Sequence, residues 1–271
     1  MKTLFCAFRL ALALGLAGSF LIGEGALRCR ARAELAAPSP AASTLDLSER
    51  IVRNALERYH RIRGYQAVLE KEELGEDGKK TKEKSFIKFD KPLAIFMGWS
   101  EGERKGMQLL YAENRFDGKM VVRLPGFLFD FIPLMSVPED DPRVRRHAKH
   151  SIKTAGIGYF IEDLWETFSN LKAQGAIEVA EIREGVQVGA ERGTLVEFIL
   201  HDPSETYPQK GVVFSDATGL PIEIRLYKPE GHLVERYSYL DLQFDPSAGD
   251  PAFRKFADPR MVSKYAEALK S

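Results

Sequence analysis

The chain has 271 residues, 44% of them hydrophobic and 29% charged, which suits one globular domain with short appendages. Its 39 basic and 39 acidic residues balance, and its one basic cluster, residues 143–150, is short, so the sequence predicts no nucleic-acid partner. Both cysteines, Cys6 and Cys29, lie in the first 33 residues, so the remainder can hold neither a disulfide nor a thiolate metal site.

Residues 1–33 are predicted to be a secretory signal peptide. Lys2 and Arg9 precede an apolar run at residues 10–22, which is shorter than the roughly 20 residues that span a bilayer. An uncleaved N-terminal anchor is the alternative interpretation of the same pattern. Because Arg28 precedes Cys29, we expect no lipid on that cysteine. The prediction is a soluble, exported, periplasmic protein.

A helix and a first set of strands follow a predicted linker over residues 34–45. Ile51, Ala55, Tyr59 and Ile62 recur at helical spacing. From residue 65 the hydrophobic period changes to two, and the predicted strands are separated by turn sequences such as G-E-D-G at residues 75–78. Connections this short favour an antiparallel meander. The predicted strands cover residues 65–74, 80–89, 93–99, 107–113 and 120–124.

A second helix, over residues 153–175, interrupts the strands. Its apolar stripe includes Phe160, Leu164 and Phe168, and Gly175 ends it. Strand patterns then resume and continue to residue 244. The predicted strands of this second meander cover residues 176–182, 193–200, 211–216, 221–227 and 233–244.

The order of these elements and two closing motifs resemble a known superfamily. The motifs are D-x-x-G-L-P-I-x-I-R, from Asp216, and Y-x-Y-L-D-L, from Tyr237. With G-Y-Q-A-V-L-E-K-E-E and K-P-L-A-I-F-M-G-W they resemble an uncharacterised bacterial branch of the LolA/LolB-like periplasmic lipoprotein and lipid carriers, over residues 46–245. No ligand-contacting residue of the carriers has an unambiguous counterpart here.

The resemblance implies an α+β fold: a strongly curved antiparallel sheet, or half-open barrel, of about ten strands, with two helices covering its concave face. Residues 246–271 are predicted to be a partly helical tail. In carriers of this kind an apolar cavity receives acyl chains. The motifs are mostly turn and core residues, so they predict the fold better than the function.

Candidate catalytic and metal sites have weaker support than their structural alternatives. Gly98 to Gly102 match the G-x-S-x-G nucleophile pattern, but the alternation that follows predicts a hairpin and not the strand-to-helix turn of a hydrolase. His147 and His150 are spaced like ligands, yet two ligands without a third make a poor zinc site. We therefore predict a protein that is not an enzyme and has no cofactor or metal.

The cavity wall is predicted from the inward face of the strands and of the second helix. Alternation places odd-numbered residues of the third strand inward, together with partners on neighbouring strands. The predicted wall consists of Ile95, Met97, Trp99, Leu109, Tyr111, Val122, Leu124, Phe160, Leu164, Phe168, Ile222, Ile224 and Leu226.

Residues 124–138 form an almost wholly apolar segment that prolines and a glycine keep from becoming a regular helix. One interpretation is a loop folded into the core. The other is a lid over the cavity or a membrane contact, made by Phe127, Phe129, Phe131, Leu134 and Met135.

Two classes of function follow. The first is a carrier or binding protein that shelters an apolar small molecule, a lipid or a lipoprotein acyl chain, with an envelope protein or the membrane surface as a further partner. The second is a structural or interaction module of the envelope whose cavity is filled by its own side chains. A large empty cavity would favour the first class, and a packed interior the second.

Overall fold

The computed structural model describes residues 40–75, 78–126, 133–142 and 151–270. The chain divides into two units, residues 1–37 and 38–271, and the second is described here. The predicted signal peptide, residues 1–33, lies outside the described residues. Within the described ranges, no helix has both the length and the apolar character needed to cross a membrane.

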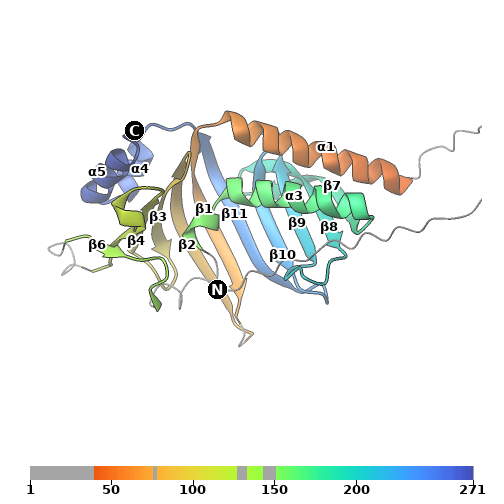
Figure 1. Ribbon diagram of the computed structural model, residues 1–271, viewed down its shortest axis with the longest axis horizontal. Helices are drawn as coiled ribbons and strands as arrows, with labels where there is room; N and C mark the ends of the chain where they lie inside the picture. Colours follow the sequence, from red (N-terminus) through yellow and green to blue (C-terminus); the bar gives the residue numbers. More distant parts are fainter. Residues whose placement is uncertain (1–39, 76–77, 127–132, 143–150, 271) are drawn as a thin grey trace, which may run out of the picture. The chain divides into compact units, whose positions relative to one another are not determined.

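One curved antiparallel sheet dominates the described part of the chain (Figure 1). Its eleven strands are ordered β6-β5-β4-β3-β2-β1-β11-β10-β9-β8-β7, so two meanders meet where β1 pairs with β11. The edge strands β6 and β7 do not pair, and the sheet stays open. The bounds are β1 Gly64–Leu74, β2 Lys80–Asp90, β3 Ala94–Glu101, β4 Gln108–Ala112, β5 Met120–Arg123, β6 Met135–Val137, β7 Ile177–Val188, β8 Glu191–Leu200, β9 Gln209–Ser215, β10 Pro221–Tyr227 and β11 Leu233–Phe244.

The predicted fold class is therefore confirmed, with one strand more than the expected ten. That strand, β6, has three residues and lies near the end of the apolar segment 124–138, in which no strand was predicted. Here the first half of the sheet means β1–β6, and the second half means β7–β11. The inner face is the concave one.

Two helices cover the inner face of the second half: α1 (Pro40–Arg61) and α3 (Ile157–Gln174) (Figure 1). They contact each other, and both contact β7. Phe168 of α3 meets the ring of Phe198 on β8 edge to face, at 5.8 Å between centroids. Helix α3 ends at Gly175, whose left-handed backbone (φ 67°) lets its N–H reach the carbonyls of Leu171 and Lys172. Helix α1 starts at Pro40, inside the range predicted as linker.

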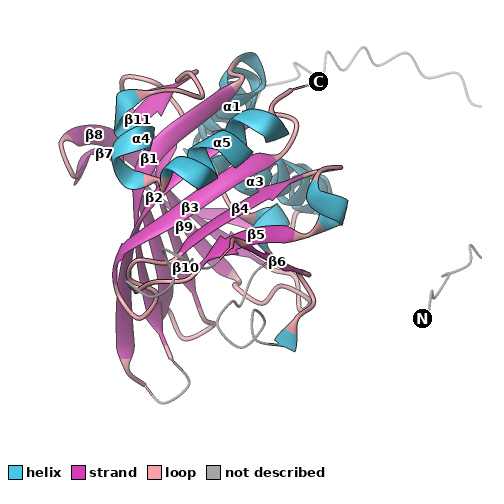
Figure 2. Cartoon of the chain, turned by 90° about the vertical axis from the view of Figure 1, so that its left-hand side faces the viewer, coloured by secondary structure: helices cyan, strands magenta, loops and turns pink. Residues whose placement is uncertain are grey.

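Two further helices pack on the outer face of the first half: α4 (Pro251–Phe256) and α5 (Pro259–Ala268) (Figure 2). Phe253 and Tyr265 of these helices join Phe86, Phe96 and Leu110 of the strands in one buried cluster. Within the predicted tail, residues 246–271, α4 and α5 are the helical parts, and they cover a face of the sheet.

A β-bulge in β10 changes the direction of one predicted cavity residue. The register between β9 and β10 shifts between Pro221 and Glu223. The extra residue, Ile222, packs with Leu195 and Val213 in a separate cluster on the outer side, while Ile224 lies in the inner core. Strict alternation would have placed both residues inward, so the prediction for Ile222 was wrong.

Short 3₁₀ helices connect the remaining strands. Helix η1 (Phe116–Gly118) precedes β5, and η3 (Ile152–Thr154) precedes α3. Ser151 caps η3, because its hydroxyl accepts the N–H of Lys153.

Candidate ligand-binding cavity

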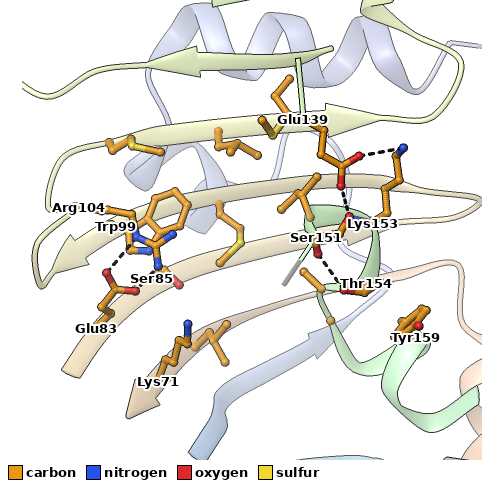
Figure 3. Close-up of a pocket in the computed structure, with 18 of the residues that line it drawn as sticks. Lys71, Glu83, Ser85, Trp99, Arg104, Glu139, Ser151, Lys153, Thr154 and Tyr159 are labelled. Carbon is orange, nitrogen blue, oxygen red and sulfur yellow. Dashed lines mark hydrogen bonds and ion pairs between the residues drawn. The ribbon is translucent and has the colours of Figure 1, made fainter. Parts of the chain in front are cut away.

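A cavity of about 1430 Å³ lies mainly against the inner face of the first half, where neither α1 nor α3 fills the space, and it extends to residues of β9, β10 and β11 (Figure 3). Small-molecule sites commonly have volumes of about 300–1,000 Å³, so this cavity is large. Strands of the first half make one wall. The segment from Ser151 to Gly156 and the first turns of α3 make the opposite side.

The wall contributed by the first half is apolar and rich in methionine. Four of the six methionines of the chain line it, and aliphatic residues fill the positions between them. Methionine is unbranched and polarizable, so a surface of this kind adapts to ligands of irregular shape. The apolar side chains of this wall are Leu69, Met97, Trp99, Met107, Leu109, Met120, Val122, Leu124, Met135 and Val137.

Most of the predicted wall residues lie on the cavity. The structure places Met97, Trp99, Leu109, Val122, Leu124, Phe160, Ile224 and Leu226 along its surface. Ile95, Tyr111, Leu164 and Phe168 are buried in the same core cluster but do not line the cavity. Ile222, as described above, lies on the other face.

The segment predicted as a lid is only partly described. Phe127, Phe129 and Phe131 lie outside the described residues. Leu134 packs against the outer cluster that α4 and α5 cover. Met135, in β6, lines the cavity.

The polar side of the cavity lies on β1, β11, β9 and the segment before β9, and the sequence analysis did not identify it. Lys71, Tyr207, Lys210, Tyr237 and Tyr239 all line the cavity. The signal was present in the alternation: Lys71 follows Leu69 on the inner face of β1, and Lys210 precedes Val212 on the inner face of β9. A lysine at an inward position of an apolar strand face is therefore the feature that marks this side.

A buried carboxylate organises part of this polar side. Glu235 accepts hydrogen bonds from the hydroxyls of Tyr207 and Tyr237, each at 2.6 Å. Burial, and then the neighbouring Glu235, raise the pKa of both tyrosines, so both stay protonated donors. Lys71 Nζ lies 2.7 Å from Glu73 Oε1 and 5.7 Å from the Tyr237 ring centroid. These groups form a connected polar network at the edge of an apolar chamber.

Ion pairs stand at two other places along the rim (Figure 3). Arg104 forms a two-point ion pair with Glu83, with one contact at 3.0 Å, and its guanidinium lies 4.4 Å from the Trp99 ring centroid. Lys153 Nζ lies 2.9 Å from Glu139 Oε2, a hydrogen bond that raises the pKa of Lys153. Both pairs hold connecting segments against the edge of the cavity.

The G-x-S-x-G pattern does not form a nucleophile elbow. Ser100 lies within β3, and its hydroxyl donates to the Lys84 carbonyl oxygen at 3.1 Å. The strand runs on to Glu101, and a turn leads to β4, as the alternation predicts. Among the described residues, no three His, Cys, Asp or Glu side chains are grouped to hold a metal ion. His147 and His150 lie outside the described residues.

Comparison with protein-family models places the chain in a family of unknown function. A family model described as "Protein of unknown function (DUF1571)" matches residues 62–260. No curated protein matches the chain.

Several solved structures match at low identity. MucB is 13% identical, with 81% of this chain and 64% of that chain covered and a TM-score of 0.44. A LolA superfamily protein from Nitrosomonas europaea is 12% identical, with coverages of 78% and 98% and a TM-score of 0.36. The lipoprotein LppX of Mycobacterium tuberculosis is 9% identical, with coverages of 76% and 97% and a TM-score of 0.41. The chain spans less than two thirds of MucB. The superfamily suggested by the sequence motifs is present among these matches.

Proposed function

Since the chain belongs to the DUF1571 family of unknown function, we propose a role from the cavity itself: the protein binds an apolar ligand, such as an acyl chain, without chemical conversion. With the predicted signal peptide, this makes it an exported binding or carrier protein of the periplasm.

The observation that supports this proposal is the unfilled inner face of the first half. The same sheet is packed tightly by α1 and α3 over its second half, so the fold is able to fill its interior with its own side chains. Over the first half it leaves about 1430 Å³ against a mainly apolar wall. Each methylene moved from water into such a space contributes about 0.8 kcal/mol, so a long acyl chain would be held firmly.

The second class of function, an interaction module whose cavity is filled by its own side chains, fits only the second half of the sheet, which α1 and α3 pack. The methionines of the first half favour binding over that alternative, because Met97, Met107 and Met135 are only partly buried and line the open cavity.

A matched pair of substitutions at Met97 tests the proposal. Met97→Trp would occupy part of the cavity, whereas Met97→Leu nearly conserves the volume. With a fluorescent fatty-acyl probe we expect wild type and Met97→Leu to bind alike and Met97→Trp to bind at least about tenfold more weakly.

Native mass spectrometry of protein purified from its host, followed by lipid extraction, identifies any ligand carried along. If wild type neither retains a lipid nor binds the acyl probe, the binding function is wrong and the interaction module takes its place.

A further inference from the structure

Three successive rows of side chains cross the inner face between β11 and β6, and their polarity changes in one direction. Residues that pair across neighbouring antiparallel strands lie side by side, about 5 Å apart, and the next row on the same face is two residues away, roughly 7 Å along the strands. The strand register therefore places the side chains of the cavity wall relative to one another. The rows are charged, then uncharged but hydrogen-bonding, then apolar.

The charged row pairs across β11, β1 and β2 and consists of Tyr237, Lys71 and Glu83. Its charges are already matched. Lys71 Nζ lies 2.7 Å from Glu73 Oε1, Arg104 forms its two-point pair with Glu83, and the tyrosine hydroxyl donates to Glu235. Among these groups two cations face three carboxylates, so an anionic ligand gains nothing at this row.

The apolar row lies at the other end of the cavity wall. Its members pair in order across β3, β4, β5 and β6, and all of them line the cavity. They are Met97, Leu109, Val122 and Met135.

The row between them carries three uncharged donors. Tyr239, Leu69, Ser85 and Trp99 pair in that order across β11, β1, β2 and β3, and each lines the cavity. The hydroxyls of Tyr239 and Ser85 and the indole N–H of Trp99 make no hydrogen bond to any residue that the structure describes. The three residues are only 4%, 3% and 5% exposed. A buried donor without an acceptor costs free energy unless a ligand or water supplies one.

The two aromatic donors are held in place. Tyr239 meets the ring of Tyr65 edge to face, at 6.5 Å between centroids, and the guanidinium of Arg104 lies 4.4 Å from the Trp99 ring centroid. Burial raises the pKa of Tyr239, so its hydroxyl keeps the proton that it donates. Ser85 and Trp99 are direct strand partners and lie together on the wall (Figure 3). The row is therefore ready to accept oxygen atoms of a ligand without rearrangement.

We propose that the cavity binds an uncharged lipid with ester-linked acyl chains, and that this middle row recognises its carbonyl oxygens. Ser85 and Trp99 donate to one carbonyl and Tyr239 to another, and the acyl chains lie along the apolar row toward β6. This inference rests on the proposed function and specifies its ligand class.

The absence of charge on the ligand follows from the neighbouring row. An ester carbonyl accepts hydrogen bonds without carrying a charge, which suits three uncharged donors. A carboxylate in the same place would be taken out of water beside a row with more carboxylates than cations, and a buried charge without a counterion is costly. The cavity volume of about 1430 Å³ also exceeds the usual range for one small molecule, which leaves room for more than one chain.

The test compares dipalmitoylglycerol with dihexadecylglycerol, its ether analogue, in competition with the fluorescent acyl probe. The two have the same head and chain length and differ in the two carbonyl oxygens. We expect wild type to bind the ester about five- to a hundredfold more tightly, the size of one or two hydrogen bonds. Equal binding would overturn the role of the middle row and leave the apolar site intact. If neither lipid binds, the proposed function falls as well.

A second pair of probes tests the charge. We expect methyl palmitate, an uncharged ester, to bind more tightly than palmitate. Equal affinities or the reverse order would overturn the assignment of an uncharged ligand.

Single substitutions locate the carbonyl contacts. Ser85→Ala and Tyr239→Phe each remove one hydroxyl and should reduce the preference for ester over ether several-fold, with the affinity for the ether unchanged. The matched control is Ser100→Ala, because the Ser100 hydroxyl already donates to the Lys84 carbonyl and does not line the cavity. It should leave the preference as in wild type.

The melting temperature of the ligand-free protein separates a binding role from a structural one. Since neither hydroxyl has an acceptor among the described residues, Ser85→Ala and Tyr239→Phe should melt at the wild-type temperature or above it. A clear fall in melting temperature, or an equal loss of ester and ether binding, would show that the hydroxyls support the fold and do not hold a carbonyl.

Ester-linked chains occur both in free glycerolipids and in the glyceride group of acylated proteins. A peptide carrying S-dipalmitoylglyceryl cysteine, measured beside dipalmitoylglycerol, distinguishes these sources by which of the two binds more tightly. Ser85→Ala should weaken both, because both carry the same carbonyls, and a loss for neither would contradict the proposal.

Discussion

The two halves of the sheet have their helices on opposite faces. Over β7–β11, α1 and α3 fill the inner face with side chains such as Phe168 and Leu164. Over the first half, α4 and α5 cover the outer face, and the inner face is left to a cavity of about 1430 Å³. A sheet must bury at least one of its two faces against apolar side chains to be stable. Helices on the outer face provide this burial for the first half, so its inner face is available to a ligand.

This arrangement separates stability from binding within one continuous sheet. The second half is a packed core, and its residues are constrained by volume. The first half is anchored from outside, so its inner residues can vary in size without the fold losing its main support. Four predictions test this difference, beginning with the largest expected effect.

Two phenylalanines on the same helix give the most direct comparison. Phe168 is fully buried in the second half, whereas Phe160, eight residues earlier, is partly exposed and lines the cavity. We expect Phe168→Ala to reduce the free energy of unfolding by about 3–5 kcal/mol. Phe160→Ala should cost about 1 kcal/mol, because the space beside it is already open. Urea denaturation measures both, and equal losses would mean that the two halves are equally packed.

The outer anchor of the first half depends on a buried hydrogen bond. Tyr265 of α5 donates to Asp90 Oδ2 at 2.6 Å, and Lys88 Nζ lies 3.6 Å from the same oxygen. Tyr265→Phe removes a hydrogen-bond donor to a charged carboxylate. We therefore expect the free energy of unfolding to fall by about 1.5–3 kcal/mol. Chemical denaturation of the two proteins checks the value, and a loss near zero would show that α5 is not a main support.

The same variant has a defined pH dependence. Burial raises the pKa of Asp90 above 3.8, while the hydrogen bond from Tyr265 and the charge of Lys88 act to lower it. Because the folded pKa is raised, the stability contributed by Asp90 is complete below 3.8 and is lost as pH rises through the folded pKa. Tyr265→Phe raises that pKa further, so the stability difference between the proteins should grow as pH rises above 3.8. A constant difference would contradict this.

The contact between α1 and α3 controls the inner cover of the second half. A Cβ added at Gly158 would lie 1.9 Å from the hydroxyl oxygen of Tyr59. Alanine in place of glycine adds about 0.5–1 kcal/mol of stability in a helix interior and less in the first turn, where Gly158 lies. Here we expect Gly158→Ala to cost about 1–3 kcal/mol, because the helices have to move apart. The melting temperature of Gly158→Ala should therefore fall below that of wild type. A higher melting temperature would mean that α1 is loosely held.

The smallest expected effect concerns the caps of the outer helices. Asp258 caps α5 by accepting the N–H of Arg260 at 2.8 Å, and it also accepts from Arg123 of β5 at 3.0 Å. Asp258→Ala should cost about 1 kcal/mol, and Asp258→Asn less, because asparagine also caps helices.

Hydrogen bonds, the one from the Arg260 side chain foremost, lower the pKa of Asp258 below 3.8. A depressed pKa means that this stability is present above 3.8 and is lost as pH falls through the folded pKa. Thermal melts at neutral and acidic pH should therefore show the difference between wild type and Asp258→Ala shrinking in acid. A difference that persists in acid would contradict the role of the ionised cap.

The candidate site was predictable where alternation is regular and not where the backbone departs from it. Met97, Trp99 and Leu109 were placed on the cavity by alternation alone, because β3 and β4 pair without interruption there. Ile222 was misplaced because a bulge adds one residue to β10, and no feature of its own sequence announces that bulge. Tyr111 was expected on the cavity wall and is instead buried beside it, which depends on neighbours distant in the chain.

Sequence reasoning predicted the local elements: the two long helices, ten of the strands, the turns at glycines and the order in which they follow one another. These follow from hydrophobic period and turn chemistry, which act over a few residues. The face of the sheet that α4 and α5 cover could not be predicted in this way, and only the tertiary structure decided it. That choice depends on contacts between residues far apart in the chain, such as Phe86 with Phe253. Because the cavity is the space those helices leave, its position and its polar side at Lys210 and Tyr239 were set at that level as well.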